Sequence, residues 1–480
     1  MFPPELDSIG RELVARYQTW VEADVEGLKV PEFLSAEEQV RDFVFSLGLD
    51  LLEVFARVRQ GQARANRRAC SCGQVPSVHR TTTWRRQTIF GPLVVADPYV
   101  YCKVCHDTER PLHALLGTDR QTWSLVLEEA AVDLVSDESC GKAVAKLERH
   151  HPGVHMDRTT ALRLLHEHGK EARTFINGKL AQAQAMAELP PALRPEGAEE
   201  LEVQFDGGMI PVGTLEPIEV AEGQEPELTP VRGLPKRRRV CRWEEAKVGL
   251  VQKPGEVDRL YSVQPTTGLE KSFEDLFSLA CIKGWSEQTQ VRGLADGARH
   301  IRQWRSDSFG MGNFRFILDR PHCKEHLSNA GQALETMTGQ AAQQWAGEAL
   351  SKAETGEVGA VIVELERAGE ASGPDQESRN DALRLEAGYF KRNHDAVAYA
   401  SSRDQGWSTA SSEVESGHRH VVQVRVKIPG AWWDPNHVDD ILALRMLKAN
   451  GWWDDYWQSG RTRWRQRAEQ FASARQPNAS

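Results

Sequence analysis

Apolar residues recur at a helical period in the first part of the chain. In residues 37–58 they stand three or four positions apart, as on the buried face of an amphipathic helix. Strand-like runs at Thr88–Val95 and Tyr99–Tyr101 then predict short strands. A second helical pattern runs from about residue 123 to residue 187. It ends in the proline-rich segment ELPPALRPEGAEE, which indicates a domain boundary.

After this boundary the pattern of apolar and polar residues changes from helical to strand-like. Residues 201–212, 244–251 and 259–266 read as strands of one sheet. In residues 289–301 and 313–327 a short strand leads directly into a helix. Strands followed by strand-helix units predict an α/β fold with a mixed sheet. The whole pattern gives seven segments: helical (1–60), compact and cysteine-containing (61–120), helical (121–190), mixed strand and helix (198–335), helical (336–400), turn-rich with a late helix (401–435), and a helical tail rich in Trp and Arg (436–480).

The composition is that of a soluble globular protein, with 40% hydrophobic and 27% charged residues. No apolar run approaches the roughly 20 residues that a membrane span requires. The first residues also lack the basic start and apolar stretch of a secretory signal. We therefore expect a cytoplasmic protein with no membrane partner.

The net charge of −10 does not suggest a nucleic-acid-binding protein, but the charges are unevenly distributed. Residues 57–96 contain eight arginines and no acidic residue, whereas residues 195–231 contain ten acidic residues and no Lys or Arg. The first segment could lie against a polyanion. The second could concentrate divalent cations or form a solvated loop.

Four of the eight cysteines form two close pairs, Cys70 with Cys72 and Cys102 with Cys105. In a reducing compartment such pairs more often bind metal than form disulfides. Four thiolates can close a tetrahedral structural Zn²⁺ site, and the residues between the pairs could form the hairpin of a zinc ribbon. The alternative is four free cysteines in a small subdomain. A zinc ribbon on an arginine-rich stretch would suit DNA docking.

Residues 125–169 have the length and the turn residues of a helix-turn-helix region. Asp157 is a good N-cap for its last helix, whose first turns carry side chains suited to phosphates or base edges. Many helical bundles share this pattern. Together with the arginine-rich segment, this region gives the candidate DNA-binding residues Arg67, Arg68, Arg80, Arg85, Arg86, Arg158, Thr159 and Arg163.

Asp206 and Asp296 each end a predicted strand and are each followed by glycine, and Glu415 lies in a late predicted helix. Carboxylates at the ends of neighbouring strands can converge on one cation. Three such acids would suit two Mg²⁺ ions about 4 Å apart, which activate a nucleophile and stabilise the leaving oxygen in displacement at phosphorus. Taken singly, an Asp at the end of a strand often only caps a turn.

These segments resemble the ISKra family of bacterial insertion-sequence transposases, which is related to the Mutator-like class. The resemblance covers most of the chain and is carried by RWEEAKVG, LADGARHI, ILDRPHCKEHL and SSEVESGHRHVVQVRVKIPGAWW. Val414-Glu415 and Gly430-Ala431-Trp432 align with the late family signature, whose leading glycines are here Ala410-Ser411-Ser412. Cys323 and His326 match a Cys-x-x-His pattern that follows the second Asp of that class.

The resemblance implies an RNase H-like catalytic core with a helical insertion over residues 336–400. It implies that Asp206, Asp296 and Glu415 hold two Mg²⁺ or Mn²⁺ ions, with Asp319 as a further ligand or a supporting acid. Cys323 and His326 would contact substrate or pack beneath a strand.

The implied activity is cleavage and strand transfer at the terminal inverted repeats of an insertion sequence. Its partners would be the double-stranded DNA of the transposon ends and of the target, and a homo-oligomer would form at the nucleoid. A nuclease without strand transfer and a domesticated, DNA-binding transposase remain the alternatives.

Overall fold

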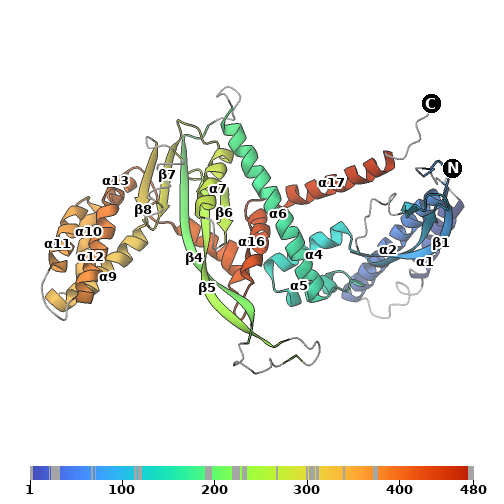
Figure 1. Ribbon diagram of the computed structural model, residues 1–480, viewed down its shortest axis with the longest axis horizontal. Helices are drawn as coiled ribbons and strands as arrows, with labels where there is room; N and C mark the ends of the chain where they lie inside the picture. Colours follow the sequence, from blue (N-terminus) through green and yellow to red (C-terminus); the bar gives the residue numbers. More distant parts are fainter. Residues whose placement is uncertain are drawn as a thin grey trace. The chain divides into compact units, whose positions relative to one another are not determined.

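The chain divides into two units, one formed by residues 1–167 with 453–480 and the other by residues 168–452 (Figure 1). The computed structural model describes residues 4–20, 22, 33–65, 69–70, 72–112, 116, 122–189, 197–218, 228–229, 235–265, 269–298, 301, 309, 313–338, 341–370 and 377–473. Arg67 and Arg68 therefore lie outside the described residues, as does most of the helix expected after Asp296. Within the described part, no helix is long and apolar enough to cross a membrane.

The first unit contains a three-stranded antiparallel sheet in the order β1-β2-β3. Alternate residues of the β1–β2 hairpin are buried, and Trp84, Leu93 and Val95 pack against Ala56 of the long second helix. This alternation places one face of the hairpin in the core. The strand predicted at Thr88–Val95 is wrong in its bounds, because the chain turns at residues 89–90, where Gly91 has a φ of +114°; the run at Tyr99–Tyr101 is the end of the second strand. The strands are β1 (Ser77–Thr88), β2 (Gly91–Tyr101) and β3 (Thr108–Glu109).

Helices from both ends of the chain belong to this unit. Arg461 of the last helix forms an ion pair with Glu129, and the Arg86 guanidinium lies 5.2 Å from the Trp464 ring centroid. The helices are α1 (Pro4–Trp20), α2 (Phe33–Ala65), α4 (Leu125–Asp137), α5 (Cys140–His150), the first turns of α6 (Arg158–Ala187), and α17 (Trp453–Ser473).

The second unit is built on a five-stranded mixed sheet in the order β6-β5-β4-β7-β8. The central strand β4 is antiparallel to β5 and parallel to β7; β5 and β6 are antiparallel, and β7 and β8 are parallel. The mixed sheet confirms the predicted α/β class. The strands are β4 (Glu200–Pro217), β5 (Arg237–Gln252), β6 (Arg259–Gln264), β7 (Gln290–Ala295) and β8 (Phe314–Leu318).

Helices cover both faces of this sheet. On one face Phe205 packs against Phe273 of α7 (Leu269–Ile282), with ring centroids 5.1 Å apart. On the other face Gly417 lies so close to Tyr261 that a Cβ atom would come within 2.7 Å of the ring. The second face carries α14 (Ser412–Gly417), a π-helical turn (His418–Gln423) and α15 (Val424–Val426).

A helical layer follows β8. It comprises α9 (Arg320–Thr338), α10 (Ala342–Glu354), α11 (Val358–Gly369), α12 (Glu377–Arg392), η3 (His394–Ala396) and α13 (Tyr399–Asp404). These helices fill the range expected for the helical insertion. After α15 the chain continues through η5 (Pro435–His437) into α16 (Val438–Ala449).

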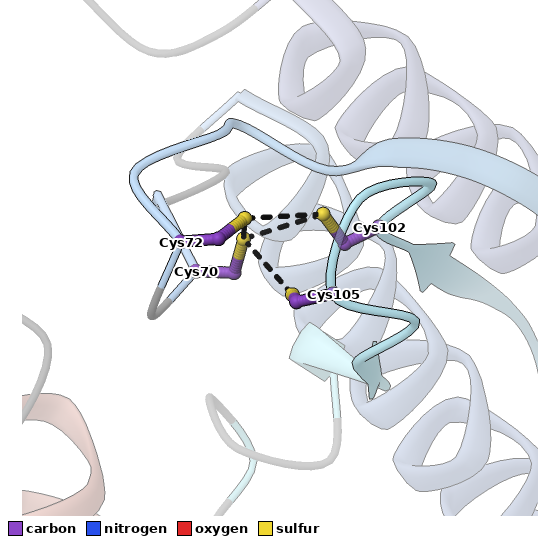
Figure 2. A group of neighbouring side chains, drawn as sticks. All are labelled: Cys70, Cys72, Cys102 and Cys105. Atoms are coloured by element: carbon purple, nitrogen blue, oxygen red, sulfur yellow. Dashed lines mark hydrogen bonds between the residues drawn. The ribbon is translucent and has the colours of Figure 1, made fainter.

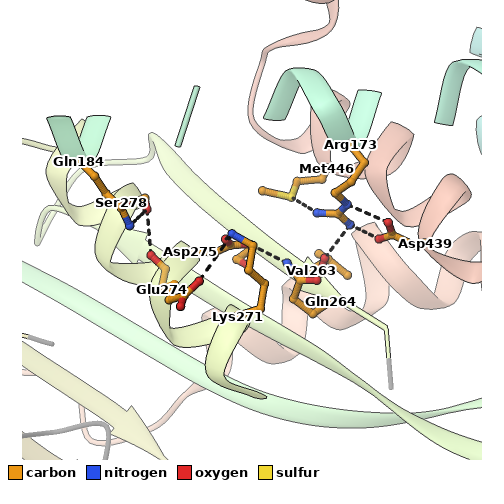
Figure 3. Close-up of polar contacts among 11 residues, drawn as sticks. Arg173, Gln184, Val263, Gln264, Lys271, Glu274, Asp275, Ser278, Asp439 and Met446 are labelled. Carbon is orange, nitrogen blue, oxygen red and sulfur yellow. Dashed lines mark hydrogen bonds and ion pairs between the residues drawn. The ribbon is translucent and has the colours of Figure 1, made fainter. Parts of the chain in front are cut away.

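Buried polar contacts join α6, α7, β6 and α16 (Figure 3). The Arg173 guanidinium of α6 bonds to the Asp439 carboxylate of α16 and donates to the Val263 carbonyl oxygen of β6 at 3.1 Å. Asp275 of α7 is fully buried and accepts from Gln264 Nε2 at 2.6 Å. Because a buried charge is costly unless it is paired, these contacts hold the elements in one arrangement.

Candidate active site

Three aspartates lie at the same edge of the five-stranded sheet. In the parallel register Gln204 pairs with Leu294, and Ala295 pairs with Leu318. Asp206 therefore falls at the level of Asp296, and Asp319 follows on the next strand. The carboxyl ends of β7 and β8 thus meet beside the middle of β4.

Asp206 is held between this edge and His418 of the π-helical turn. His418 Nε2 lies 3.2 Å from the Asp206 carbonyl oxygen and 3.7 Å from Asp206 Oδ2. The close approach requires glycine at Gly208, where a Cβ atom would lie 2.6 Å from His418 Nδ1. Burial raises the pKa of Asp206, and the negative charge of Asp296 adds to the rise, while His418 and His322 oppose it. Burial lowers the pKa of His418.

Asp296 is positioned by the helical layer. The Tyr389 hydroxyl of α12 donates to the Asp296 carbonyl oxygen at 2.6 Å, and Asn393 Nδ2 donates to the Gly297 carbonyl oxygen at 3.1 Å. Gly297 has a φ of +77°, and a Cβ atom there would lie 2.5 Å from Leu318. Only glycine fits this turn, which explains the Asp-Gly pair.

Asp319 is almost fully buried, and both of its carboxylate oxygens are already bonded. Oδ1 accepts from the Ser411 backbone N–H at 2.6 Å and from its hydroxyl at 2.8 Å. Oδ2 accepts from the His322 backbone N–H at 3.1 Å and lies 2.7 Å from His322 Nδ1. Burial by itself would raise the pKa of Asp319, but these bonds outweigh it and hold the pKa below its usual value. Asp319 therefore ties the start of α9 to the segment before α14.

His322 is a site residue that the sequence analysis missed. Its bond to Asp319 raises its pKa to about 9, and the charges of Asp206 and Asp296 contribute to the rise. The imidazole is therefore protonated at neutral pH beside three carboxylates. The available signal was the Asp-x-x-His spacing of Asp319 and His322, which places both groups on the first turn of a helix.

Cys323 and His326 lie behind this edge. Cys323 is fully buried, and burial raises the pKa of its thiol to about 11. His326 Nδ1 lies 2.6 Å from Glu386 Oε2, and its ring stacks on Tyr389 with centroids 3.6 Å apart. Of the two expectations for this pair, the geometry favours packing: His326 supports the tyrosine that holds Asp296.

Glu415 does not join the two aspartates. Its side chain is 62% exposed, and its Oε1 accepts from Arg419 at 2.6 Å. Among the described residues, the ligand atoms of Asp206, Asp296 and Glu415 do not all lie within 4.8 Å of one another. The helix that carries Glu415 is nevertheless fixed to β4, because the Val414 backbone N–H donates to Gln204 Oε1 at 2.9 Å.

The four paired cysteines form a compact cluster (Figure 2). Cys70 Sγ lies 2.9 Å from Cys72 Sγ, 3.3 Å from Cys102 Sγ and 3.5 Å from Cys105 Sγ. Four thiolates about 2.3 Å from a zinc ion stand about 3.8 Å apart, so only a small expansion is needed. Backbone N–H groups of Cys105 and Val104 lower the pKa of Cys102 to about 6, which favours the thiolate form. The cluster could hold a structural metal ion.

The candidate DNA-binding residues separate by exposure. Arg80, Arg85, Arg158 and Thr159 are exposed. Arg86 is 94% buried beside Trp84 and Trp464, and burial lowers its pKa to about 10. This burial argues against a phosphate contact by Arg86, since its guanidinium completes the packing of α17.

The start of α6 agrees with the predicted N-cap. Asp157 accepts from the Thr160 backbone N–H and hydroxyl, each at 2.8 Å. Arg163 forms an ion pair with Glu167 on the same helix, with Arg163 Nη1 2.7 Å from Glu167 Oε2.

The tryptophans near the C-terminal end of the sequence differ in burial, and Trp432, Trp453 and Trp464 are half-buried. Trp433, Trp452 and Trp457 are buried.

Neither a scan against protein-family models nor a search of curated proteins found a match to this chain.

Proposed function

We propose that this protein is a DDE-type DNA transposase with an RNase H-like core. The observation that carries the proposal is the meeting of Asp206 and Asp296 at one edge of a sheet with three antiparallel strands followed by two parallel ones. The late helix with Glu415 packs on the same face as Asp206. The order of the strands and the positions of Asp206 and Asp296 support this proposal.

The residues at this edge suit a divalent cation. Carboxylate oxygens are the ligands that Mg²⁺ and Mn²⁺ prefer, and Asp206, whose pKa is raised by burial, lies beside Asp296. Bound ions would activate the attacking water or 3′-hydroxyl and stabilise the leaving oxygen. Asp206 and Asp296 would hold them from β4 and β7.

Glu415 would complete the set after its exposed side chain rotates away from Arg419. Asp319 would act as a positioning residue, because every lone pair that it presents is used to join β8, α9 and Ser411. His322 would remain protonated and donate to a phosphate oxygen of the DNA. Each role follows from the bonds that the side chain already makes.

The first unit would supply DNA docking. In this proposal the cysteine cluster and the β1–β2 hairpin form a zinc ribbon, and α4, α5 and the start of α6 form the helix-turn-helix region. Exposed Arg80, Arg85 and Arg158 would contact the terminal inverted repeats. A homo-oligomer would bring two ends together before strand transfer.

The test is cleavage of a labelled duplex that carries the element's own end, in Mg²⁺ or Mn²⁺. Wild type should cut at the end and Glu415→Gln should not. Glu413→Gln is a matched control, because Glu413 lies two residues away and pairs with Arg259 at 2.8 Å. Cleavage by Glu415→Gln at the wild-type rate would move the third ligand to Asp319. Binding without cleavage by wild type would contradict the transposase proposal, and cutting without joining would favour a nuclease.

A further inference from the structure

A two-stranded arm extends from the sheet of the second unit (Figure 1). Strand β7 pairs with β4 only over residues 200–204, and β6 pairs with β5 only over residues 247–252. Beyond these ranges β4 and β5 continue alone, with residues 208–217 paired to residues 237–246. We call this two-stranded part the arm.

The outer half of β5 carries the basic residues of the arm, which also contains Glu216, Glu244 and Glu245. Residues 236–242 read KRRRVCR and include no acid. Successive side chains of a strand point to opposite faces, so Arg237 and Arg239 lie on one face and Arg238 and Arg242 on the other. All four are exposed, and the neighbouring Trp243 is 58% exposed. A ribbon with cations on both faces is unsuited to packing in a core.

The arm contacts another segment of the second unit along its length, at Gly213 and Arg239. The Gly213 backbone N–H donates to the Trp433 carbonyl oxygen at 2.9 Å. The Arg239 guanidinium lies 3.9 Å from the Trp432 ring centroid, and a Cβ atom at Gly213 would lie 2.8 Å from that ring. Arg425 in turn lies over Trp433 at 4.6 Å. The Gly-Ala-Trp-Trp segment therefore links the arm to α15, which carries Arg425.

We propose that the arm binds duplex DNA beside the cleavage position, an inference that rests on the proposed function. The major groove of B-DNA admits a two-stranded β-ribbon, and exposed arginines contact its phosphates. Strand β4 runs from Asp206 directly into the arm. At about 3.4 Å per residue, the arginines stand roughly 20 to 37 Å along the ribbon from Asp206, which corresponds to about 6 to 11 base pairs.

The first test removes charge from the end of the arm. Arg237→Ser with Arg238→Ser should weaken binding to a plain duplex and reduce the slope of log affinity against log salt by about 2, since each phosphate contact contributes about 0.9. Arg384→Ser with Lys391→Ser removes the same charge from the helical layer, where both side chains are exposed, and should leave the slope unchanged. An unchanged slope in the folded arm variant would overturn the proposal, as would a loss of self-association with no change in DNA binding.

The second test uses the wild-type fold. Cys241 is an exposed cysteine on the arm, opposite Gly213. A photo-crosslinker on this thiol should react with bound duplex DNA about 7 base pairs from the cleaved end, and Cys241→Ser should abolish that product. Bound DNA that does not crosslink would contradict the proposal. Because plain duplex and uncut DNA serve as probes, crosslinking without cleavage would leave the arm in place and count only against the transposase reaction.

Discussion

The protein has two candidate metal sites, the cysteine cluster and the sheet edge that carries Asp206, Asp296 and Asp319, here called the aspartate edge. They differ in how closely their candidate ligands already lie together. The four thiols come from two short turns of one hairpin, and their sulfur atoms already stand within hydrogen-bond distance of one another. Asp206, Asp296 and Glu415 come from three distant segments, and Glu415 remains turned toward Arg419.

The difference reflects what each site must do. A closed tetrahedral site stabilises a fold and needs no room for substrate. A catalytic site must keep ligand positions open, and it tolerates like charges that only a cation would relieve. The four thiols of the cluster therefore already lie together, whereas at the aspartate edge the pKa of Asp206 is raised and Glu415 is paired with Arg419.

The largest expected effect on the comparison between the two sites is that of a substitution at Asp206. Asp206→Asn should reduce cleavage by about a thousandfold or more, because each tenfold loss requires only about 1.4 kcal/mol of transition-state stabilisation. Binding of the same DNA in Ca²⁺ should be unchanged. A variant that no longer binds DNA would show that Asp206 is structural, and the two sites would then not differ in the proposed way.

A substitution in the cysteine cluster should affect metal content and folding. Cys102→Ser should lower bound zinc and expose the β1–β2 hairpin to protease, because the metal contributes to the folding of its site. Metal content and limited proteolysis measure the two effects. Cys281→Ser, which changes a cysteine outside the cluster, should change neither. Full zinc content in Cys102→Ser would rule out the four-cysteine site.

A smaller effect concerns pH at the aspartate edge. The folded-state pKa of His322 is raised to about 9, so its bond to Asp319 stabilises the fold fully below the unfolded pKa of about 6.5. This contribution is lost as the pH rises from 6.5 to 9. In metal-free buffer the melting temperature of wild type should fall over this range by about 1–2 °C more than that of His322→Gln, a modest difference because the pair is partly exposed to solvent. Parallel profiles for the two proteins would contradict the assignment.

The smallest effect separates two adjacent arginines of the first unit. Arg85→Ala should reduce the salt slope of DNA binding by about 1 and leave the melting temperature unchanged, because the side chain is exposed. Arg86→Ala should instead lower the stability of the first unit, since it removes the contact with Trp464. Equal salt slopes in wild type and Arg85→Ala would move the docking surface elsewhere.

Local patterns carried most of what the sequence could predict. Strand-like runs predicted strands in the hairpin segment and in β4, and the spacing of the cysteines predicted a cluster. The glycines at Gly208 and Gly297 marked close approaches. Each of these features depends on residues within one or two neighbouring elements. A short stretch of sequence is therefore enough to predict it.

Contacts between residues far apart in the sequence could not be predicted in the same way. The Ser411 bonds that occupy Asp319 come from a residue 92 positions later, and no local pattern announces them. The burial of Arg86 depends on a tryptophan near the other end of the sequence. The basic strand of the arm was overlooked because it follows the acidic stretch and the net charge is negative.

The place of α17 has a consequence for synthesis. Trp464 and Arg461 complete packing against residues made early, but the whole second unit is translated between them. At about 5–20 residues per second, roughly 300 intervening residues take about 15 to 60 s. During this time Arg86 lacks Trp464 and Glu129 lacks Arg461 on every nascent chain. The first unit therefore cannot complete this packing until α17 has been translated.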